Sequence, residues 1–230
     1  MRKAGPNNAF VCFNSRGIPG SGGEFHEKTL TDDLDDLHDT VVAIRQHYPN
    51  ASDVVLCGLS TGAFLTLAYL DSTRSSSCSI LPTCAIVFAC VDDIPTSKVL
   101  DFTPKQISDM NKKGFCTTDF YPVGCNGVPE RKRLDVGYLR SYDKFWGATT
   151  MAQRIKTPVL LIHGTADKHV PYSHAKRLLK CLQSHSSLGS KGFDLITVEG
   201  GNHFLSSKKH FKLAEREILR WLSALMSGYS

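Results

Sequence analysis

The sequence predicts an α/β fold in which a mostly parallel sheet is flanked by helices. Three observations support this prediction. Short apolar runs alternate with segments of helical periodicity along most of the 230 residues, a pattern typical of parallel strands joined by helices. A glycine-containing turn joins one of these runs directly to a helix. The composition, with 41% apolar and 21% charged residues, is that of a globular protein.

Five apolar runs are interpreted as strands. The first, residues 9–13 (AFVCF), predicts a buried strand that ends in a glycine-rich turn at residues 16–23. The other predicted strands are residues 53–57, 83–91, 158–163 and 194–198.

Four longer segments are interpreted as helices of the main fold. In residues 31–48 apolar side chains recur at steps of three and four, which indicates an amphipathic helix. Thr31 is its predicted N-cap, and the aspartates of its first turns favour the positive end of the helix dipole. This acidic run therefore indicates a solvated helix start rather than a metal site. The other predicted helices run from just after Ser60 to residue 70, over 171–183 and over 211–226.

Residues 92–150 interrupt the alternation and predict a lid or cap inserted into a single domain of residues 1–230. A short helix is expected at 104–113, a hairpin turn at Asn126-Gly127 and a helical piece at 136–145. The basic residues of the insertion indicate mainly a solvated face, and the alternative is a lid that favours acidic substrates. They are Lys98, Lys105, Lys112, Lys113, Arg131, Lys132 and Arg133.

Charge and composition exclude several classes of protein. The net charge of +5, from 27 basic and 22 acidic residues, is too small to indicate nucleic-acid binding. No apolar run approaches the ~18 residues of a membrane span, and the N-terminus lacks the long apolar region of a secretory signal. The eight cysteines are sparse and contain no CxxC pair, so a disulfide scaffold is not expected and a cytoplasmic location is predicted.

The segment Gly58-Leu59-Ser60-Thr61-Gly62 matches the pattern G-x-S-x-G. It lies directly after one predicted strand and directly before a helix, which is the context of a nucleophile elbow. We expect both glycines to permit a sharp turn where a Cβ would clash. Ser60 is then the candidate nucleophile, and the backbone N–H of Thr61 is a candidate oxyanion donor.

A serine nucleophile needs a base and an acid that orients it. His203, in a glycine loop between the last predicted strand and the last helix, fits the base; His163 is interpreted as a structural donor, and His169 lacks a matching loop. Asp167, just after the strand at 158–163, fits the acid. The alternative acid is Asp92 or Asp93, after the third strand.

These segments resemble the α/β-hydrolase superfamily, most closely its esterase, dienelactone-hydrolase-like and serine-aminopeptidase-like branch. The resemblance rests on FNSRGIPGSGGEF, GLSTG, PVLLIHGTADKHVPY and VEGGNHF. It implies the α/β-hydrolase fold and hydrolysis of an ester, thioester or amide of a small acyl substrate through an acyl-serine, without metal or cofactor. It also implies the chain order of nucleophile Ser60, acid Asp167 and base His203.

Two features leave alternatives open. The glycine loop at 16–23 does not match a P-loop or the pattern G-x-G-x-x-G, so nucleotide binding is disfavoured. The segment before residue 9 contains no further strand, although the resemblance implies one upstream that carries a second oxyanion donor. We therefore expect a sheet that lacks its N-terminal part, as in a truncated, catalytically weak or silent form that acts as a binding module. The alternative is that Asn14, Ser15 or Arg16 donates the second bond.

Overall fold

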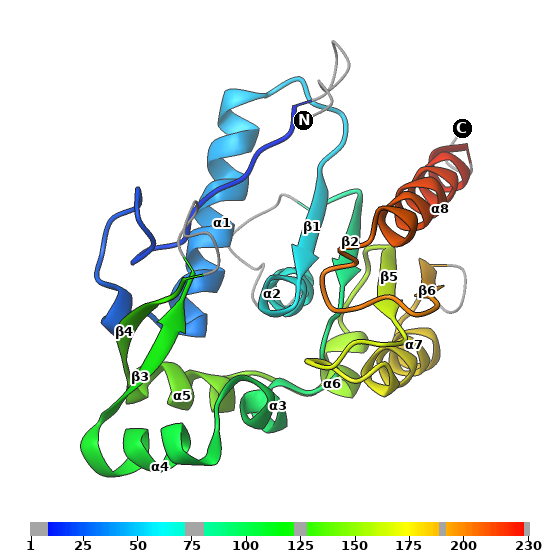
Figure 1. The fold of residues 1–230 in the computed structure, drawn as a ribbon. Coiled ribbons are helices and arrows are strands. Elements are labelled where there is room, and N and C mark those ends of the chain that lie inside the picture. The colour runs from blue at the N-terminus through cyan, green and yellow to red at the C-terminus, as the bar shows by residue number, and fades with distance from the viewer. Residues whose placement is uncertain (1–8, 72–80, 122–127, 189–191, 228–230) are drawn as a thin grey trace.

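The computed structural model describes residues 9–71, 81–121, 128–188 and 192–227. A four-stranded parallel sheet in the order β1-β2-β5-β6 forms its centre (Figure 1). Apolar side chains fill the interior of the sheet, and β5 is buried along its whole length. The strands are β1 (Val55–Leu59), β2 (Cys84–Phe88), β5 (Val159–Gly164) and β6 (Phe193–Val198).

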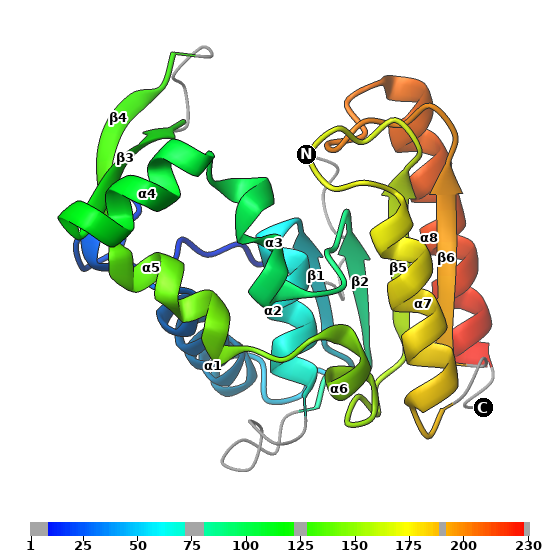
Figure 2. The ribbon, with the colours of Figure 1, turned by 90° about the horizontal axis from the view of Figure 1, so that it is seen from below.

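Helices cover both faces of this sheet (Figure 2). One face carries Leu160 and Ile162 of β5 and packs against α8, whereas Val159 and Leu161 point to the larger core on the other face. This division follows from the two-residue repeat of a strand. The helices of the main fold are α1 (Leu30–His47), α2 (Thr61–Leu70), α7 (Ser173–His185) and α8 (Lys208–Ser227).

Four of the five predicted strands and all four helices of the main fold are confirmed, with ends displaced by at most a few residues. The cap of α1 is corrected. Thr29, and not Thr31, is its N-cap, and the Thr29 hydroxyl accepts a hydrogen bond from the Asp32 N–H at 3.1 Å. The helix therefore begins one residue earlier than its apolar periodicity predicts.

The predicted buried strand at residues 9–13 is wrong. These residues are exposed and form no regular structure, and the side chains of Phe10, Val11 and Phe13 are 78%, 45% and 43% exposed. An apolar run becomes a strand only if a neighbouring backbone pairs with it. Within the described residues β1 pairs with β2 alone, so β1 is an edge strand and residues 9–13 lie outside the sheet.

Residues 92–150, which the sequence analysis describes as an insertion, lie between β2 and β5 of the main sheet. Two strands that the sequence analysis did not list form an antiparallel ribbon, and the hairpin turn expected at Asn126-Gly127 lies outside the described residues. Phe102, Met110 and Leu134 belong to the same hydrophobic cluster as α2 and the sheet, so the insertion shares the main core. Its elements are α3 (Ile94–Asp101), α4 (Pro104–Lys113), β3 (Phe115–Phe120), β4 (Glu130–Asp135), α5 (Val136–Ser141), the short helix Tyr142–Lys144 and α6 (Ala148–Ala152); a further short helix, Phe25–Glu27, precedes α1.

The basic side chains of the insertion are largely neutralised by acids of the same insertion. Lys98 pairs with Asp143 at 3.0 Å, and Asp109 bridges two lysines of α4. These pairs agree with a solvated face rather than with a surface that collects anions. The basic members of the ion pairs are Lys98, Lys105, Lys113, Arg131, Lys132 and Arg133.

Among the described helices, none has both the length and the apolar character that crossing a bilayer requires. The six described cysteines carry free thiols, which agrees with the expectation that no disulfide scaffold is present.

Candidate active site

Ser60 occupies a sharp turn between β1 and α2. Its backbone has φ 56° and ψ −120°, a left-handed conformation that costs energy for any residue with a Cβ. The Ser60 N–H donates to the Phe88 carbonyl at 2.9 Å, which ties the turn to β2. A Cβ at Gly58 would lie 2.2 Å from the Gly62 carbonyl oxygen, whereas a Cβ at Gly62 would meet nothing. A steric clash therefore requires glycine at position 58 but not at position 62. The expectation that both glycines are needed to avoid a clash is wrong for Gly62.

Asp167 and His203 come from loops that follow the neighbouring strands β5 and β6. His203 Nδ1 donates to Asp167 Oδ2 at 2.8 Å, and both side chains are buried. Asp167 Oδ1 accepts the backbone N–H groups of His169 and Val170 at 2.8 and 2.9 Å. Burial opposes ionisation of Asp167, but the hydrogen bonds from His203 and from these two amides outweigh it and lower the pKa of Asp167. The carboxylate therefore fixes the imidazole with Nδ1 protonated and Nε2 available as a base.

The two loops are joined through their backbones. The Ala166 N–H donates to the Gly201 carbonyl at 2.9 Å, and the Thr165 N–H donates to the Val198 carbonyl at 3.0 Å. A Cβ at Gly164 would lie 2.1 Å from the Gly201 oxygen. Glycine is thus needed where the Asp167 loop approaches the His203 loop.

Replacing Gly164 by alanine is expected to destabilise the fold by at least about 2 kcal/mol, because overpacking against backbone forces the loops apart. The midpoint of urea unfolding measures this effect. The matched control is Gly137→Ala, where the nearest atom to a new Cβ is 3.7 Å away on Thr29 and alanine favours the helix. Equal midpoints for Gly164→Ala and the wild type would contradict the close approach.

Of the other candidates, Asp92 has partners of its own, whereas His163 Nε2 also lies 3.3 Å from Asp167 Oδ2. Asp92 accepts a hydrogen bond from His174 Nδ1 at 2.6 Å and also pairs with Arg177. The backbone of Asp93 bridges Gly147, and among the described residues its buried Oδ1 has no hydrogen-bond partner. The described hydrogen bonds of His203 reach Asp167 and neither of these alternatives. His163 Nε2 bonds the Val170 carbonyl at 2.8 Å, and burial lowers the pKa of His163 despite that bond, as expected for a structural donor.

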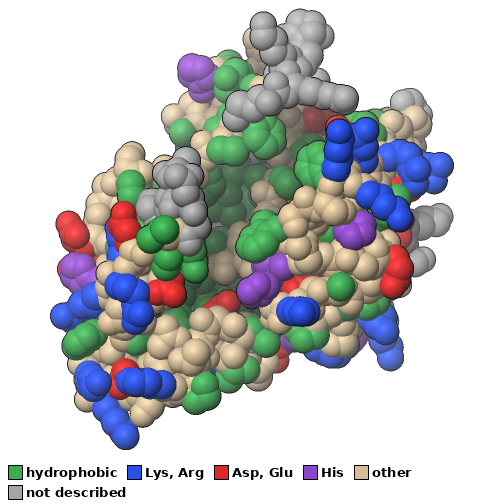
Figure 3. Space-filling view, in the orientation of Figure 1, with side chains coloured by type: hydrophobic (Ala, Val, Ile, Leu, Met, Phe, Trp, Pro, Cys, Tyr) green, Lys and Arg blue, Asp and Glu red, His purple; other side chains and the backbone are tan. Residues whose placement is uncertain are grey.

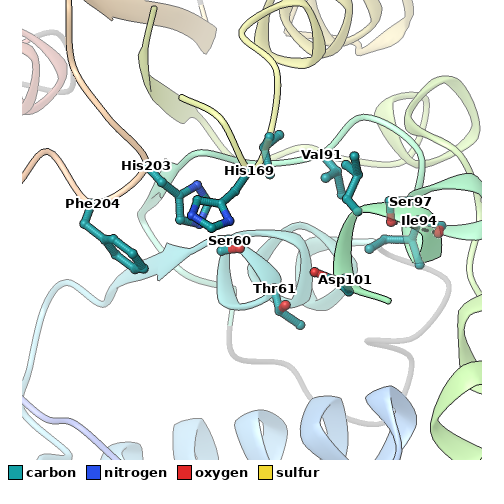
Figure 4. Close-up of a pocket in the computed structure, with 11 residues that line it drawn as sticks. Ser60, Thr61, Val91, Ile94, Ser97, Asp101, His169, His203 and Phe204 are labelled. Atoms are coloured by element: carbon teal, nitrogen blue, oxygen red, sulfur yellow. Dashed lines mark hydrogen bonds between the residues drawn. The ribbon is translucent and has the colours of Figure 1, made fainter. Parts of the chain in front are cut away.

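A pocket of about 120 Å³ contains both Ser60 and His203. In Figure 4 the His203 ring lies beside Ser60, and Thr61 lies at the start of α2. As the first residue of this helix, Thr61 has a backbone N–H without an intrahelical acceptor. Figure 3 shows that this face of the molecule is hollowed, with hydrophobic side chains inside the hollow and histidines at its rim.

Asn14, Ser15 and Arg16 do not line this pocket. The Asn14 amide donates to the Pro19 carbonyl, and the Arg16 backbone N–H donates to Asp36 at 2.7 Å. The Arg16 guanidinium also binds Asp36. The Arg16 bonds anchor the glycine loop to α1.

The sequence analysis assigned only Ser60, Thr61 and His203 among the eleven pocket residues, and three of the others are notable. The His169 ring lies 5.0 Å from the His203 ring, and Phe204 packs edge-on against His203 at 4.9 Å. Asp101, from α3, forms part of the pocket wall. His169 could have been identified from the sequence, because it lies two residues after Asp167. No local pattern indicated Asp101.

Comparison with known proteins gives one family match. Residues 126–228 match the model of the prolyl oligopeptidase family, a segment that contains Asp167 and His203 but not Ser60. No curated protein matches the chain.

Solved structures of hydrolases share the fold. A putative hydrolase from Agrobacterium vitis is 18% identical, with 90% of this chain and 73% of that chain covered and a TM-score of 0.65. Est1E from Butyrivibrio proteoclasticus, solved with ferulic acid bound, is 18% identical, with 93% of this chain and 76% of that chain covered and a TM-score of 0.67. The α/β-hydrolase domain-containing protein 10 from mouse is 20% identical over 92% and 76%, with a TM-score of 0.62. With the parallel sheet and its flanking helices, these matches show that the chain has the α/β-hydrolase fold.

Proposed function

We propose that this protein is a serine hydrolase that cleaves a carboxylic ester, thioester or amide through an acyl-serine intermediate. One observation carries the proposal. The buried Asp167–His203 pair, bonded at 2.8 Å, lies in the same pocket as Ser60, which the β1–α2 turn holds in a left-handed conformation. Such a turn, with a base and an orienting acid beside it, is the arrangement that activates a serine hydroxyl.

In the proposed mechanism His203 Nε2 removes the Ser60 proton as Ser60 Oγ attacks the acyl carbon. Asp167 keeps Nδ1 protonated and stabilises the imidazolium that forms. The Thr61 N–H donates to the oxyanion, assisted by the positive end of α2. His203 then protonates the leaving group, and water attacks the acyl-enzyme with His203 again as base.

Among the three bond types we favour the ester. The solved structures with the same fold include Est1E with ferulic acid bound and a monoacylglycerol lipase from Paleococcus ferrophilus. The match to the prolyl oligopeptidase family supports the amide as the second choice.

We also propose that residues 92–150 form the lid of a single hydrolase domain. Helix α3 supplies Ile94, Ser97 and Leu100 to the pocket wall, so this insertion determines much of the shape that the acyl group meets. A cytoplasmic location stays a prediction from the sequence.

The second candidate function is a catalytically weak or silent binding module. It is favoured by one observation, that Asn14 and Arg16 are bonded elsewhere and leave the Thr61 N–H as the assigned oxyanion donor. Loss of one donor costs on the order of 10²–10³ in rate.

A fluorophosphonate probe separates the two functions. The folded protein should gain one probe mass on the peptide that contains Ser60, and esters of graded acyl length should be hydrolysed. Heat-denatured protein and His203→Ala serve as controls and should not label. A folded wild-type chain that neither labels nor hydrolyses any ester would support the silent module.

A further inference from the structure

Asp101 is the last residue of α3 and forms part of the pocket wall. In Figure 4 its carboxyl group points towards Thr61, while the rings of His169 and His203 lie on the other side of Ser60. Among the described residues that line the pocket, Asp101 is the one carboxylate, and none is a lysine or an arginine. A fixed negative charge therefore lies beside the position where an acyl group would bind.

A buried tyrosine orients this carboxylate. The Tyr142 hydroxyl donates to Asp101 Oδ2 at 2.6 Å, and Tyr142 is only 1% exposed, whereas Asp101 is exposed. The described hydrogen bonds of Asp101 use Oδ2, which leaves Oδ1 for a ligand. Burial raises the pKa of Asp101, and the Tyr142 hydrogen bond and the charge of His203 offset this only in part.

The surrounding charges do not cancel this effect. The basic residues of the insertion pair with acids outside the pocket, as Lys98 does with Asp143 at 3.0 Å. A substrate carboxylate placed near Asp101 would be repelled by the Asp101 carboxylate. This argues against the alternative, given in the sequence analysis, that the lid favours acidic substrates. A substrate cation would meet an oriented acceptor in a partly desolvated site, where charged hydrogen bonds are strongest.

We propose that Asp101 binds a positively charged group of the substrate, a primary ammonium within a few bonds of the scissile carbonyl. The inference rests on the proposed hydrolase function and names its substrate class, esters or amides of amino-bearing acids. A hydrogen bond to a charged group of this kind favours the cationic substrate over its neutral isostere by roughly 10- to 100-fold. The apolar residues Val91, Ile94 and Phe204 of the same pocket would hold the remainder of the acyl group.

Three esters of one shape test the proposal. Alanine methyl ester, methyl isobutyrate and methyl hydrogen methylmalonate differ in one substituent, which is an ammonium, a methyl or a carboxylate. We measure the ratio of kcat/KM for the ammonium ester to that for the methyl ester, at a pH where the ammonium is protonated. The wild type should prefer the cation, and Asp101→Asn should lower the ratio by at least about tenfold.

Two further variants separate recognition from a structural role. Tyr142→Phe removes the hydrogen bond but keeps the carboxylate, so it should retain the preference for the cation. Asp143→Asn removes a lid acid that pairs with Lys98 outside the pocket, so it should leave the ratio unchanged. A wild type without a preference, or an Asp101→Asn ratio equal to the wild type, would overturn the proposal.

A binding measurement keeps this inference distinct from the proposed function. Calorimetric titration of alaninamide into Ser60→Ala, with and without Asp101→Asn, needs no turnover. Binding that weakens about tenfold or more without the Asp101 carboxylate supports the cation site even if no ester is hydrolysed. Failure of hydrolysis alone then counts against the proposed function, and equal binding by the two variants counts against the cation site.

Discussion

Replacing Ser60 by alanine is expected to abolish ester hydrolysis, with a loss in kcat on the order of 10⁶. Without the Ser60 hydroxyl no acyl-enzyme forms, and His203 has no proton to remove. The fold should be unaffected, because alanine keeps the Cβ that the left-handed turn already accommodates and no described hydrogen bond of the Ser60 hydroxyl is lost. Hydrolysis rates and urea midpoints of the two proteins measure both expectations.

Ser186→Ala is the matched control for this change. The Ser186 hydroxyl is buried and donates to the Ile155 carbonyl at 2.7 Å, so its removal should cost about 1 kcal/mol of stability while hydrolysis continues. Turnover by Ser60→Ala at the wild-type rate would reject Ser60 as the nucleophile. Because the control keeps its activity despite this cost, a midpoint of Ser60→Ala no lower than that of the control would exclude unfolding as the cause of lost hydrolysis.

Asp167→Asn is expected to lower kcat by roughly 10⁴. The asparagine oxygen can still accept the two backbone amides, but its amide group would face His203 Nδ1 as a donor. The imidazole would then carry its proton on Nε2, where it cannot act as a base. Initial rates at saturating substrate, with circular dichroism to verify folding, measure the effect.

The same substitution should change stability in acid. Because the folded-state pKa of Asp167 is lowered, its ionised form stabilises the protein above the unfolded pKa of about 4. That contribution is lost as the pH falls towards the folded pKa. Asp167→Asn should therefore show a weaker decrease of unfolding free energy over this acid range.

Asp92→Asn is the comparison variant, since Asp92 also holds a histidine and an arginine. It should retain most of the activity. If Asp167→Asn left the activity nearly unchanged while Asp92→Asn or Asp93→Asn largely abolished it, the catalytic acid would be the aspartate that follows β2 instead.

The candidate catalytic residues could be predicted because each follows a strand of a parallel sheet. The carboxyl ends of such strands meet at one edge, so chain order alone brings Asp167 and His203 to the same place. The turn at Ser60 was also a local signal, since Gly58 must approach the Gly62 carbonyl.

The pocket walls could not be predicted in this way. Asp101 reaches the pocket because α3 packs against the short helix Tyr142–Lys144, a contact between segments that no local pattern specifies. The run at residues 9–13 shows the same limit, because its apolar composition does not supply a partner strand. Thr31 failed as a cap for a simpler reason: Thr29 lies nearby with the same hydroxyl chemistry.

The position of β1 at the edge of the sheet has a consequence for the dynamics of the candidate nucleophile. Within the described part of the chain, the backbone of β1 is held by one ladder of hydrogen bonds, to β2, and the side chains of Val55 and Leu59 are each 40% exposed. Local opening of an edge strand costs less free energy than global unfolding, so the amides of β1 exchange with solvent sooner than those of the central β5. The strained backbone of Ser60 relaxes whenever this ladder opens. Any segment that pairs with the outer edge of β1 raises the free energy of opening, and the fraction of molecules with an intact elbow rises with it.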